Sequence, residues 1–336
     1  MKVTVFSTKP YDKEYLEKAN KEFNLELIFL ENKITEHTVL LANDSEAICV
    51  FVNDIIDKKI IEYLSKGKTK LIALRSAGFN NVDLEAAAEY GIKVVRVPAY
   101  SPHSVAEHTI ALLLALNRKI YKAHNRIREG NFAIDGLLGF DIHDKVAGII
   151  GTGKIGAEAA KILSGFGCKV IAYDTKPDPG LEQAGVCYSS LDDIFRYSDI
   201  ISLHCPLIPE TFHLINDNSI SIMKKGVVLL NTSRGALIDT KAVIRGLKKG
   251  KIGYLGLDVY EEEGDLFFQD LSNIVIQDDV FARLLTFPNV IVTGHQAFFT
   301  KEALTNISET TLSNIAEFSK TGKCKNEVVN VSVPKI

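Results

Sequence analysis

The chain has 336 residues, 46% hydrophobic and 24% charged, which is ordinary for a folded protein long enough for two domains. Its 39 basic and 42 acidic side chains give a net charge of -3 without a basic block that could neutralise a run of phosphates, so nucleic acid is not an expected partner. The sequence shows neither the apolar core of a signal peptide nor an apolar run near the ~20 residues of a membrane span. We therefore expect a cytoplasmic protein without a membrane partner.

The cysteines are odd in number, widely spaced and free of any C-x-x-C pair. This usage is typical of a reducing compartment, so we expect reduced and mostly buried thiols. The five positions are Cys49, Cys168, Cys187, Cys205 and Cys324.

Short β-branched runs recur along the chain, each followed by a helical pattern, and this alternation predicts parallel sheets covered by helices. The first series of runs lies at 2–6, 26–30, 47–52, 70–75 and 93–97. The second series lies at 145–151, 169–174, 199–205, 226–233, 254–259 and 290–294. The pattern therefore predicts an α/β protein with two doubly wound parallel-sheet domains.

Two long helices are expected outside these series. One covers roughly 103–122 and contains VAEHTIALLLALNR. This stretch is apolar on all faces, which is not the pattern of a helix with one solvent-exposed face. We expect it to be buried, with burial between subunits as one explanation, and therefore expect a homodimer or homotetramer. The other helix begins after Thr300, a favourable N-cap residue.

The sharpest local motif is Gly151-Thr152-Gly153-Lys154-Ile155-Gly156, which follows the strand VAGII directly and opens a helix. In a dinucleotide-binding turn, the first glycine permits the tight bend, the second lets backbone approach the pyrophosphate, and the third allows helix and strand to pack closely. Asp174 ends the next strand, close to the ~20-residue spacing of an acid that binds the adenosine ribose, which favours NAD over NADP. The alternative is that Asp174 only caps a turn.

This motif lies in the middle of the chain, with another α/β unit before it. The economical arrangement is a Rossmann cofactor domain inserted into a second domain, with the crossings near 103 and near 296–300 and the ligands bound in the cleft between the domains.

Three polar segments each follow the carboxyl end of a predicted strand: 231–235, 258–263 and 294–297. Ligands of open α/β sheets bind at that edge, so an Arg, a Glu and a His would converge there. Taken singly, each has a plainer explanation: a surface ion pair, a solvated acid and a hydrogen-bonded core histidine. A chance alignment of all three is far less expected.

Together these segments resemble the D-isomer-specific 2-hydroxyacid dehydrogenase family over essentially the whole chain, and within it the chain looks like the bacterial fermentative D-lactate dehydrogenases. The matching segments are RSAGFNNVDL at 75–84, VPAYSPHSVAEH at 97–108, GTGKIG at 151–156, SLHCPL at 202–207, NTSRGALID at 231–239, LDVYEEEGDLFF at 257–268 and TGHQAFFT at 293–300. The resemblance implies a flavodoxin-like substrate domain at 1–102 and 299–336, a NAD-binding Rossmann domain at 103–298, and reversible NADH-dependent reduction of pyruvate to D-lactate.

The resemblance also implies the catalytic residues Arg234, Glu263 and His295, with Glu263 chosen among three adjacent glutamates because it lies five positions after Asp258. Arg234 would bind the substrate carboxylate and polarise its carbonyl with its rigid fork. His295 would give a proton to the developing alkoxide, while the Glu263 anion orients the ring and favours its charged form. Glu261 and Glu262 would be ordinary surface acids.

The remaining site residues are implied in the same way. On the substrate side, backbone N–H groups of Ala77 and Gly78 would bind the carboxylate, Tyr100 would close over the substrate, and Phe51 and Phe298 would leave room for little beyond a methyl group, unless both are simply core. A catalytic thiol at Cys205 is poorly supported because no base is paired with it. The cofactor side comprises Gly151, Gly153, Lys154, Ile155, Gly156, Asp174, His204, Cys205, Pro206, Thr211, Thr232 and Asp258.

No metal site is expected. His103 and His108 lie five positions apart on a helix, so their rings point to different faces, and a structural role is favoured. Two other functions use the same sequence features: a reductase for a broader range of 2-keto acids, such as glyoxylate or hydroxypyruvate, and an NAD-sensing corepressor. The compact chain without a long disordered tail weighs against the corepressor.

Overall fold

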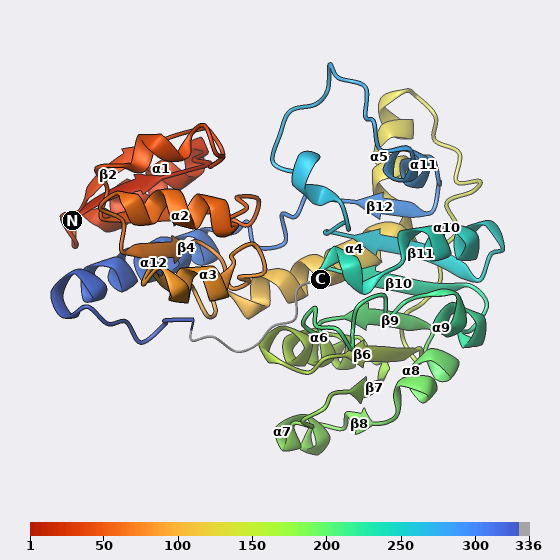
Figure 1. Cartoon of the computed structure of the whole chain (residues 1–336). Coiled ribbons are helices and arrows are strands. Elements are labelled where there is room, and N and C mark those ends of the chain that lie inside the picture. Colours follow the sequence, from red (N-terminus) through yellow and green to blue (C-terminus); the bar gives the residue numbers. More distant parts are fainter. Residues whose placement is uncertain (329–336) are drawn as a thin grey trace. The chain divides into compact units, whose positions relative to one another are not determined.

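The computed structural model describes residues 1–328 (Figure 1). The described chain forms two compact units: unit 1 comprises residues 1–101 and 299–328, and unit 2 comprises Pro102–Phe298. Residues 329–336, which the sequence analysis assigns to the substrate domain, lie outside the described residues. Among the described helices, none is both long and apolar enough to cross a membrane.

Unit 1 contains a five-stranded parallel sheet in the order β2-β1-β3-β4-β5, which is the flavodoxin-like order. The strands are β1 Lys2–Val5, β2 Glu26–Phe29, β3 Ala47–Val50, β4 Leu71–Leu74 and β5 Lys93–Val95. The parallel sheet predicted from the first series of β-branched runs is therefore confirmed.

Helices cover both faces of this sheet because alternate strand residues point to opposite sides. Ile48 and Val50 pack with α2 and α3 on one face, whereas Ala47 and Cys49 pack with α1 and α12 on the other. The N-cap prediction for Thr300 is confirmed, since its side chain accepts a hydrogen bond from the first turn of α12. The helices are α1 Pro10–Asn20, η1 Val39–Ala42, α2 Lys58–Lys66, α3 Leu84–Glu89 and α12 Lys301–Thr321.

Unit 2 contains a seven-stranded parallel sheet in the order β12-β11-β10-β9-β6-β7-β8. Apart from the extra edge strand β12, this is the order of a Rossmann sheet, and the direction of winding reverses at β6. The strands are β6 Val146–Ile150, β7 Lys169–Tyr173, β8 Cys187–Tyr188, β9 Ile200–Leu203, β10 Val227–Asn231, β11 Ile252–Leu257 and β12 Val290–Val292. The second predicted doubly wound sheet is thus also confirmed.

The helices of unit 2 lie on both faces of this sheet. Apolar side chains of α4 and α6 cover one face, and those of α8, α9 and α10 cover the other. The helices are α4 Pro102–Arg118, α5 Ile120–Arg128, α6 Lys154–Gly165, α7 Pro179–Gln183, α8 Leu191–Tyr197, α9 Asp217–Ile222, η2 Gly235–Leu237, α10 Thr240–Lys248, η3 Glu263–Asp265 and α11 Asp279–Leu285.

The prediction of one buried helix over 103–122 is wrong at its C-terminal end. Lys119 adopts a left-handed conformation with a φ of 49°, which ends α4 and starts a second helix, α5. Most of α4 is buried in the unit, but α5 has no buried residue. A pattern of apolar residues indicates which residues are buried, but it does not show whether they belong to one helix or two. A single left-handed residue that divides the helix therefore leaves no signal in the pattern.

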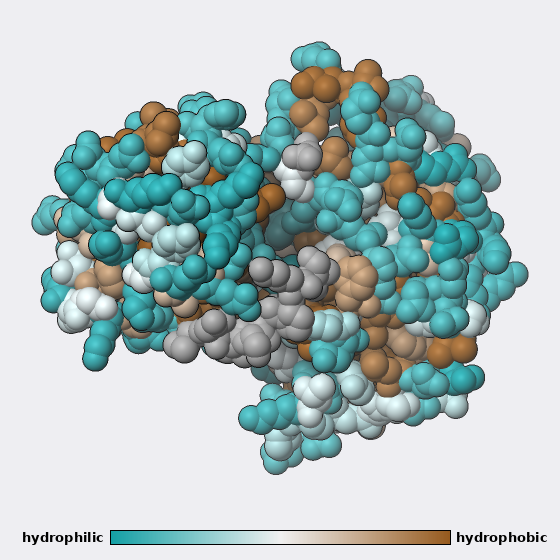
Figure 2. Space-filling view, in the orientation of Figure 1, coloured by the Kyte–Doolittle hydropathy of each residue, from teal (hydrophilic) through white to brown (hydrophobic). Residues whose placement is uncertain are grey.

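Exposed apolar side chains concentrate in two segments of unit 2. The first runs from α5 to Leu138, where Phe132, Ile134 and Leu138 are 75%, 82% and 85% exposed. The second lies between η3 and α11, where Ile274 and Val275 are 62% and 76% exposed, and Figure 2 shows this apolar patch on the visible face.

All the cysteines are free thiols, as expected. Cys187 is exposed and the other four are buried.

Candidate active site

Five loops of unit 2 meet at one edge of its sheet. Gly151, His204, Arg234, Asp258 and His295 follow β6, β9, β10, β11 and β12, respectively. These strands are neighbours and run parallel, so their carboxyl ends lie at the same edge, beside the switch point at β6. The convergence that the sequence predicts for these segments follows from the observed strand order.

The glycine turn has the shape that a bound pyrophosphate requires. Gly151 has a φ of 92°, and a Cβ there would lie 2.5 Å from the backbone nitrogen of Cys205. A Cβ on Gly156 would lie 1.9 Å from the carbonyl oxygen of Gly151. A Cβ on Gly153 would meet nothing within 4 Å, so the backbone at the start of α6 is open to a ligand, and its N–H groups are suited to an anion. The turn therefore fits a dinucleotide.

Asp174 follows β7 and is held in a fixed orientation. Its Oδ2 accepts from the backbone N–H of Thr152 at 2.6 Å, and its Oδ1 accepts from that of Lys176 at 2.8 Å. Burial alone would raise the pKa of this carboxyl, but the hydrogen bonds from Lys176 and Thr152 outweigh it and lower the pKa below its usual value. Tyr188 on β8, for which the sequence carries no functional signal, donates to the Thr152 hydroxyl at 2.8 Å. The site thus offers a carboxylate that is ionised at neutral pH beside the glycine turn.

The loop after β9 offers uncharged groups. Burial lowers the pKa of His204 to about 4, so its ring is neutral, and its Nε2 lies 2.9 Å from the Ser202 hydroxyl. Burial raises the pKa of the Cys205 thiol to about 11, so it stays protonated and is a poor nucleophile. Thr211 donates to the carbonyl of Pro206 at 2.7 Å and so shapes the loop itself.

The segment after β10 is fixed by buried polar groups. Asn231 is fully buried, and its side chain accepts from Ser233 N and donates to the carbonyl of Arg234. The hydroxyl of Thr232 lies 2.8 Å from that of Thr109 on α4. The guanidinium of Arg234 donates to Ser233 O at 2.7 Å, and no carboxylate of the described residues pairs with it. Its remaining donors therefore suit an anionic ligand.

His295 and Glu263 form a direct pair. The Nδ1 of His295 lies 2.7 Å from Oε1 of Glu263, whose Oε2 accepts from Tyr260 N at 3.0 Å. Because Nδ1 faces the carboxylate, the proton that can be exchanged with a ligand is carried on Nε2. His295 also has a φ of 52°, a left-handed conformation that is unusual for a residue with a side chain and is enriched at functional sites.

Asp258 anchors the loop that carries His295. It is fully buried, and its carboxylate accepts from Gln296 N at 2.9 Å, Ala297 N at 2.8 Å and the hydroxyl of Thr293 at 2.5 Å. Burial would raise the pKa of this carboxyl, but hydrogen bonds, first of all one with His108, lower it overall. Its carbonyl also accepts from His295 N at 2.8 Å. Asp258 therefore holds the backbone that places the His295 ring.

The substrate-side residues assigned from the sequence lie in unit 1, except Phe298. The carbonyl of Ala77 accepts from Arg96 at 2.8 Å, and that of Gly78 accepts from the Ser76 hydroxyl at 2.8 Å. The backbone hydrogen bonds among the described residues include none donated by the N–H groups of Ala77 and Gly78. Of the other substrate-side residues assigned from the sequence, Tyr100 is half-buried, and Phe51 and Phe298 are only 8% and 7% exposed.

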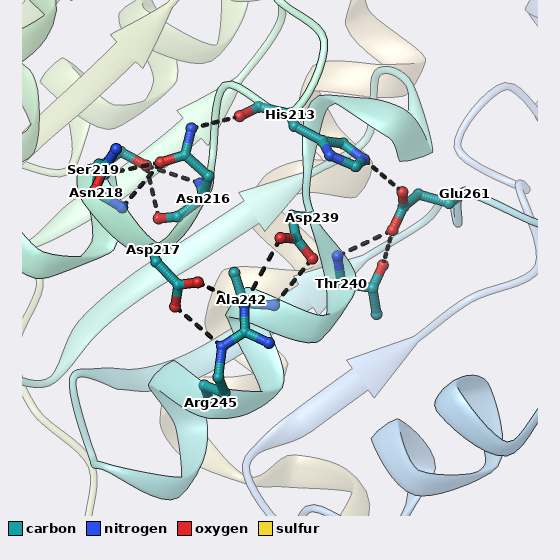
Figure 3. Close-up of polar contacts among 10 residues, drawn as sticks. All are labelled: His213, Asn216, Asp217, Asn218, Ser219, Asp239, Thr240, Ala242, Arg245 and Glu261. Atoms are coloured by element: carbon teal, nitrogen blue, oxygen red, sulfur yellow. Dashed lines mark hydrogen bonds and ion pairs between the residues drawn. The ribbon is translucent and has the colours of Figure 1, made fainter.

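The prediction that Glu261 is an ordinary surface acid is wrong. Its Oε1 lies 2.6 Å from Nε2 of His213, and its Oε2 accepts from the backbone N–H and the hydroxyl of Thr240 (Figure 3). Three adjacent glutamates look alike in a sequence, and only the turn after β11 separates the inward side chains of Glu261 and Glu263 from exposed Glu262.

Comparison with known proteins identifies the family. Residues 110–297 match the family model for the D-isomer specific 2-hydroxyacid dehydrogenase, NAD binding domain. The chain belongs to this family. It is 54% identical to a D-lactate dehydrogenase of Escherichia coli over 98% of this chain and 100% of the relative. Among solved structures, a D-lactate dehydrogenase of Salmonella is 54% identical with a TM-score of 0.86, covering 98% of this chain and 100% of that one. The pyruvate reductase of Chlamydomonas reinhardtii is 48% identical with a TM-score of 0.92, covering 97% and 98%.

In this D-2-hydroxyacid dehydrogenase, the two histidines of the HSVAEH stretch have separate surroundings. His103 is exposed and lies 3.5 Å from Glu158, whereas His108 is mostly buried and lies 3.1 Å from the Thr293 hydroxyl. The structural role favoured by the sequence fits both. The contribution of His108 to the His295 loop has no signal in the sequence, because it depends on α4 packing against the ends of β11 and β12.

Replacing Asp174 by Ala should weaken NADH binding and reduce the preference for NADH over NADPH in this dehydrogenase. The ionised carboxylate can accept from ribose hydroxyls and repels an added phosphate. Charge-assisted hydrogen bonds of this kind are worth roughly ten- to a hundredfold in affinity. Fluorescence titration with both nucleotides measures the change, and a parent enzyme that binds NADPH as tightly as NADH would contradict the assignment.

Proposed function

We propose that this dehydrogenase reduces pyruvate reversibly to D-lactate with NADH, and that His295 is the general acid and base. The observation that carries the proposal is the 2.7 Å His295–Glu263 pair at the sheet edge that also holds the glycine turn and Arg234. The identity to D-lactate dehydrogenases over nearly the full chain supports the choice of substrate. We assign residues 103–298 to NAD binding and residues 1–102 and 299–336 to substrate binding.

When bound, the nicotinamide would supply the hydride. The residues of the chain would bind the substrate, polarise its carbonyl and transfer the proton. Arg234 binds the carboxylate of the 2-keto acid and polarises its carbonyl, because its planar fork can donate to both groups. We also propose that the N–H groups of Ala77 and Gly78 donate to the substrate carboxylate. His295 gives its Nε2 proton to the carbonyl oxygen during reduction and takes it back during oxidation. Glu263 holds the ring in this orientation through Nδ1.

Glu263→Gln should move the alkaline limb of the pH profile for pyruvate reduction to lower pH. Reduction needs the imidazolium, so its rate falls as rising pH removes the ring proton. A neighbouring carboxylate extends the charged form to higher pH, and an amide of the same shape does not. The measurement is kcat/KM for pyruvate against pH in both enzymes. Coincident profiles would mean that the Glu263 charge does not act on His295.

A panel of 2-keto acids tests the substrate assignment directly. The kcat/KM for pyruvate should exceed those for phenylpyruvate and 2-ketoisocaproate, because Phe51 and Phe298 are proposed to leave room for little beyond a methyl group. Phe51→Leu should narrow this gap by lengthening the pocket. The product should be D-lactate, and chiral analysis checks it. Preference of the parent for the bulky acids would favour the alternative, a reductase of broader 2-keto acid range, and L-lactate would contradict the stereochemistry.

We also infer a homo-oligomer, dimeric or tetrameric, in the cytoplasm. The apolar side chains exposed from α5 to Leu138 would be covered by a second copy of the chain, since such contiguous exposure is unusual on a monomer. The free thiols fit a reducing compartment. Analytical ultracentrifugation tests the assembly, and a monomer at micromolar concentration would refute it.

A further inference from the structure

A single carboxylate joins three loops of the catalytic edge of unit 2. Glu261, in the loop between Asp258 and Glu263, contacts His213 in the loop after β9 at 2.6 Å and Thr240 in the segment after β10 at 2.9 Å to its backbone nitrogen. Figure 3 shows these side chains turned toward one another from separate segments. Only 21% of the Glu261 side chain and 32% of that of His213 are exposed. We call Glu261, His213 and Thr240 the loop clamp.

The backbone on either side of the clamp is in close contact. A Cβ on Gly235 would lie 2.1 Å from the carbonyl carbon of Tyr260, so the residue after Arg234 packs directly on the residue before Glu261. His213 N donates to the carbonyl of Ala236 at 2.9 Å. The loops that carry Arg234 and Glu263 are therefore placed against each other at the clamp.

His213 is held for this contact. Its φ of 49° is left-handed, and its ring stacks on that of Phe212 with centroids 4.0 Å apart. Its carbonyl accepts from the Asn216 side chain at 2.8 Å. A left-handed residue with a side chain costs conformational energy, so the surrounding contacts must maintain it.

Capping of α10 accounts for only part of the clamp, because Glu261 accepts from the first N–H of that helix, at Thr240, but also contacts His213 in another loop. Asp239 already caps that helix, since its side chain accepts from Ala242 N at 3.0 Å. Arg245 also pairs with Asp217 between α10 and α9, and these two side chains are largely exposed, at 46% and 63%. Glu261 is the carboxylate that ties these elements to the loop of Glu263.

We propose that Glu261 and His213 are positioning residues that fix Glu263 and Arg234 relative to each other. This proposal rests on the proposed function, which assigns Glu263 and Arg234 their roles toward the substrate. A displacement near 1 Å at a catalytic group can cost ~10²-fold in rate, so loss of the clamp should be visible in kinetics without touching the reacting atoms.

Two variants test the clamp, with a matched control beside it. Glu261→Gln keeps the shape but loses the charge that holds His213, and His213→Phe keeps the ring stacking but loses the hydrogen bond. Each should lower kcat/KM for pyruvate roughly tenfold or more while NADH affinity changes little. Each should also move the alkaline limb of the pH profile toward that of Glu263→Gln. Glu262→Gln, one residue away and exposed, should match the parent.

A measurement without turnover separates this inference from the proposed function. The His295 ring signal, assigned by its loss in His295→Gln, can be titrated by NMR in each variant. Its midpoint should fall in Glu261→Gln, because Glu263 is less firmly held against the ring. An unshifted midpoint together with parent-like kinetics, or a loss of activity explained by unfolding alone, would overturn the clamp. A parent that reduces no 2-keto acid would overturn the proposed function while the NMR titration still decides the clamp.

Discussion

His295→Gln should lose nearly all turnover with pyruvate while still binding NADH. General acid–base catalysis contributes typically ~10²–10⁴-fold, and the Nε2 of His295 is the proposed donor of the proton that the alkoxide needs. Gln offers an amide of similar reach but no proton that it can give up near neutral pH. The glycine turn and Asp174 lie on other strands, so the cofactor contacts should persist.

Steady-state kinetics and NADH titration of the same preparation measure the two effects. A fall in kcat with an unchanged NADH dissociation constant identifies a lost catalytic group and not a damaged fold. Near-normal turnover in this variant would remove His295 as the acid. His103→Gln is the control, because that ring is exposed and lies beside Glu158 instead of Glu263.

The sequence predicts the sheet edge well because it depends on short local signals. A strand, a glycine turn and a helix coincide at 151–156, and polar residues follow buried strands at Arg234, Asp258 and His295. Parallel winding then brings those residues together whatever the details of the helices between them. The fold class and the convergence of the site are thus fixed by periodicity and order alone.

The parts that the sequence does not predict are those decided by tertiary contacts. The break at Lys119 lies inside an apolar pattern that continues on both sides of it. Glu261 and Glu262 are neighbours of the same type, yet one ties three loops together and the other is exposed. Short elements such as β8 hold too few residues for a period to appear.

The left-handed backbone of His295 is a further case. Histidine adopts a positive φ more often than most residues but still uncommonly, so its presence in the sequence does not predict this conformation. The conformation is imposed by the backbone N–H groups of 295–297 bonding to Asp258, and it directs the ring to Glu263. The geometry of the His295–Glu263 pair therefore depends on Asp258, a buried carboxylate at the end of the preceding strand, β11.

Arg234→Lys should lower kcat/KM for pyruvate by roughly 10²–10³-fold, the range seen when one preorganised donor to a reacting oxygen is removed. Lys keeps the positive charge, so attraction of the carboxylate to the site persists in part. The planar fork is lost, however, and a single ammonium cannot hold the carboxylate and polarise the carbonyl with fixed geometry. Both KM and kcat should therefore change, in contrast to His295→Gln, where kcat carries the loss.

The inhibitor oxamate, which has the shape of pyruvate but is not reduced, isolates the binding part of this effect. Its dissociation constant from the NADH complex should rise in Arg234→Lys and stay close to the parent value in Glu263→Gln. Lys225→Arg, an exposed cation at the opposite end of β10, serves as the control for a change of cation type. If Arg234→Lys bound oxamate as the parent does and lost only kcat, Arg234 would act on the carbonyl alone and would not hold the carboxylate.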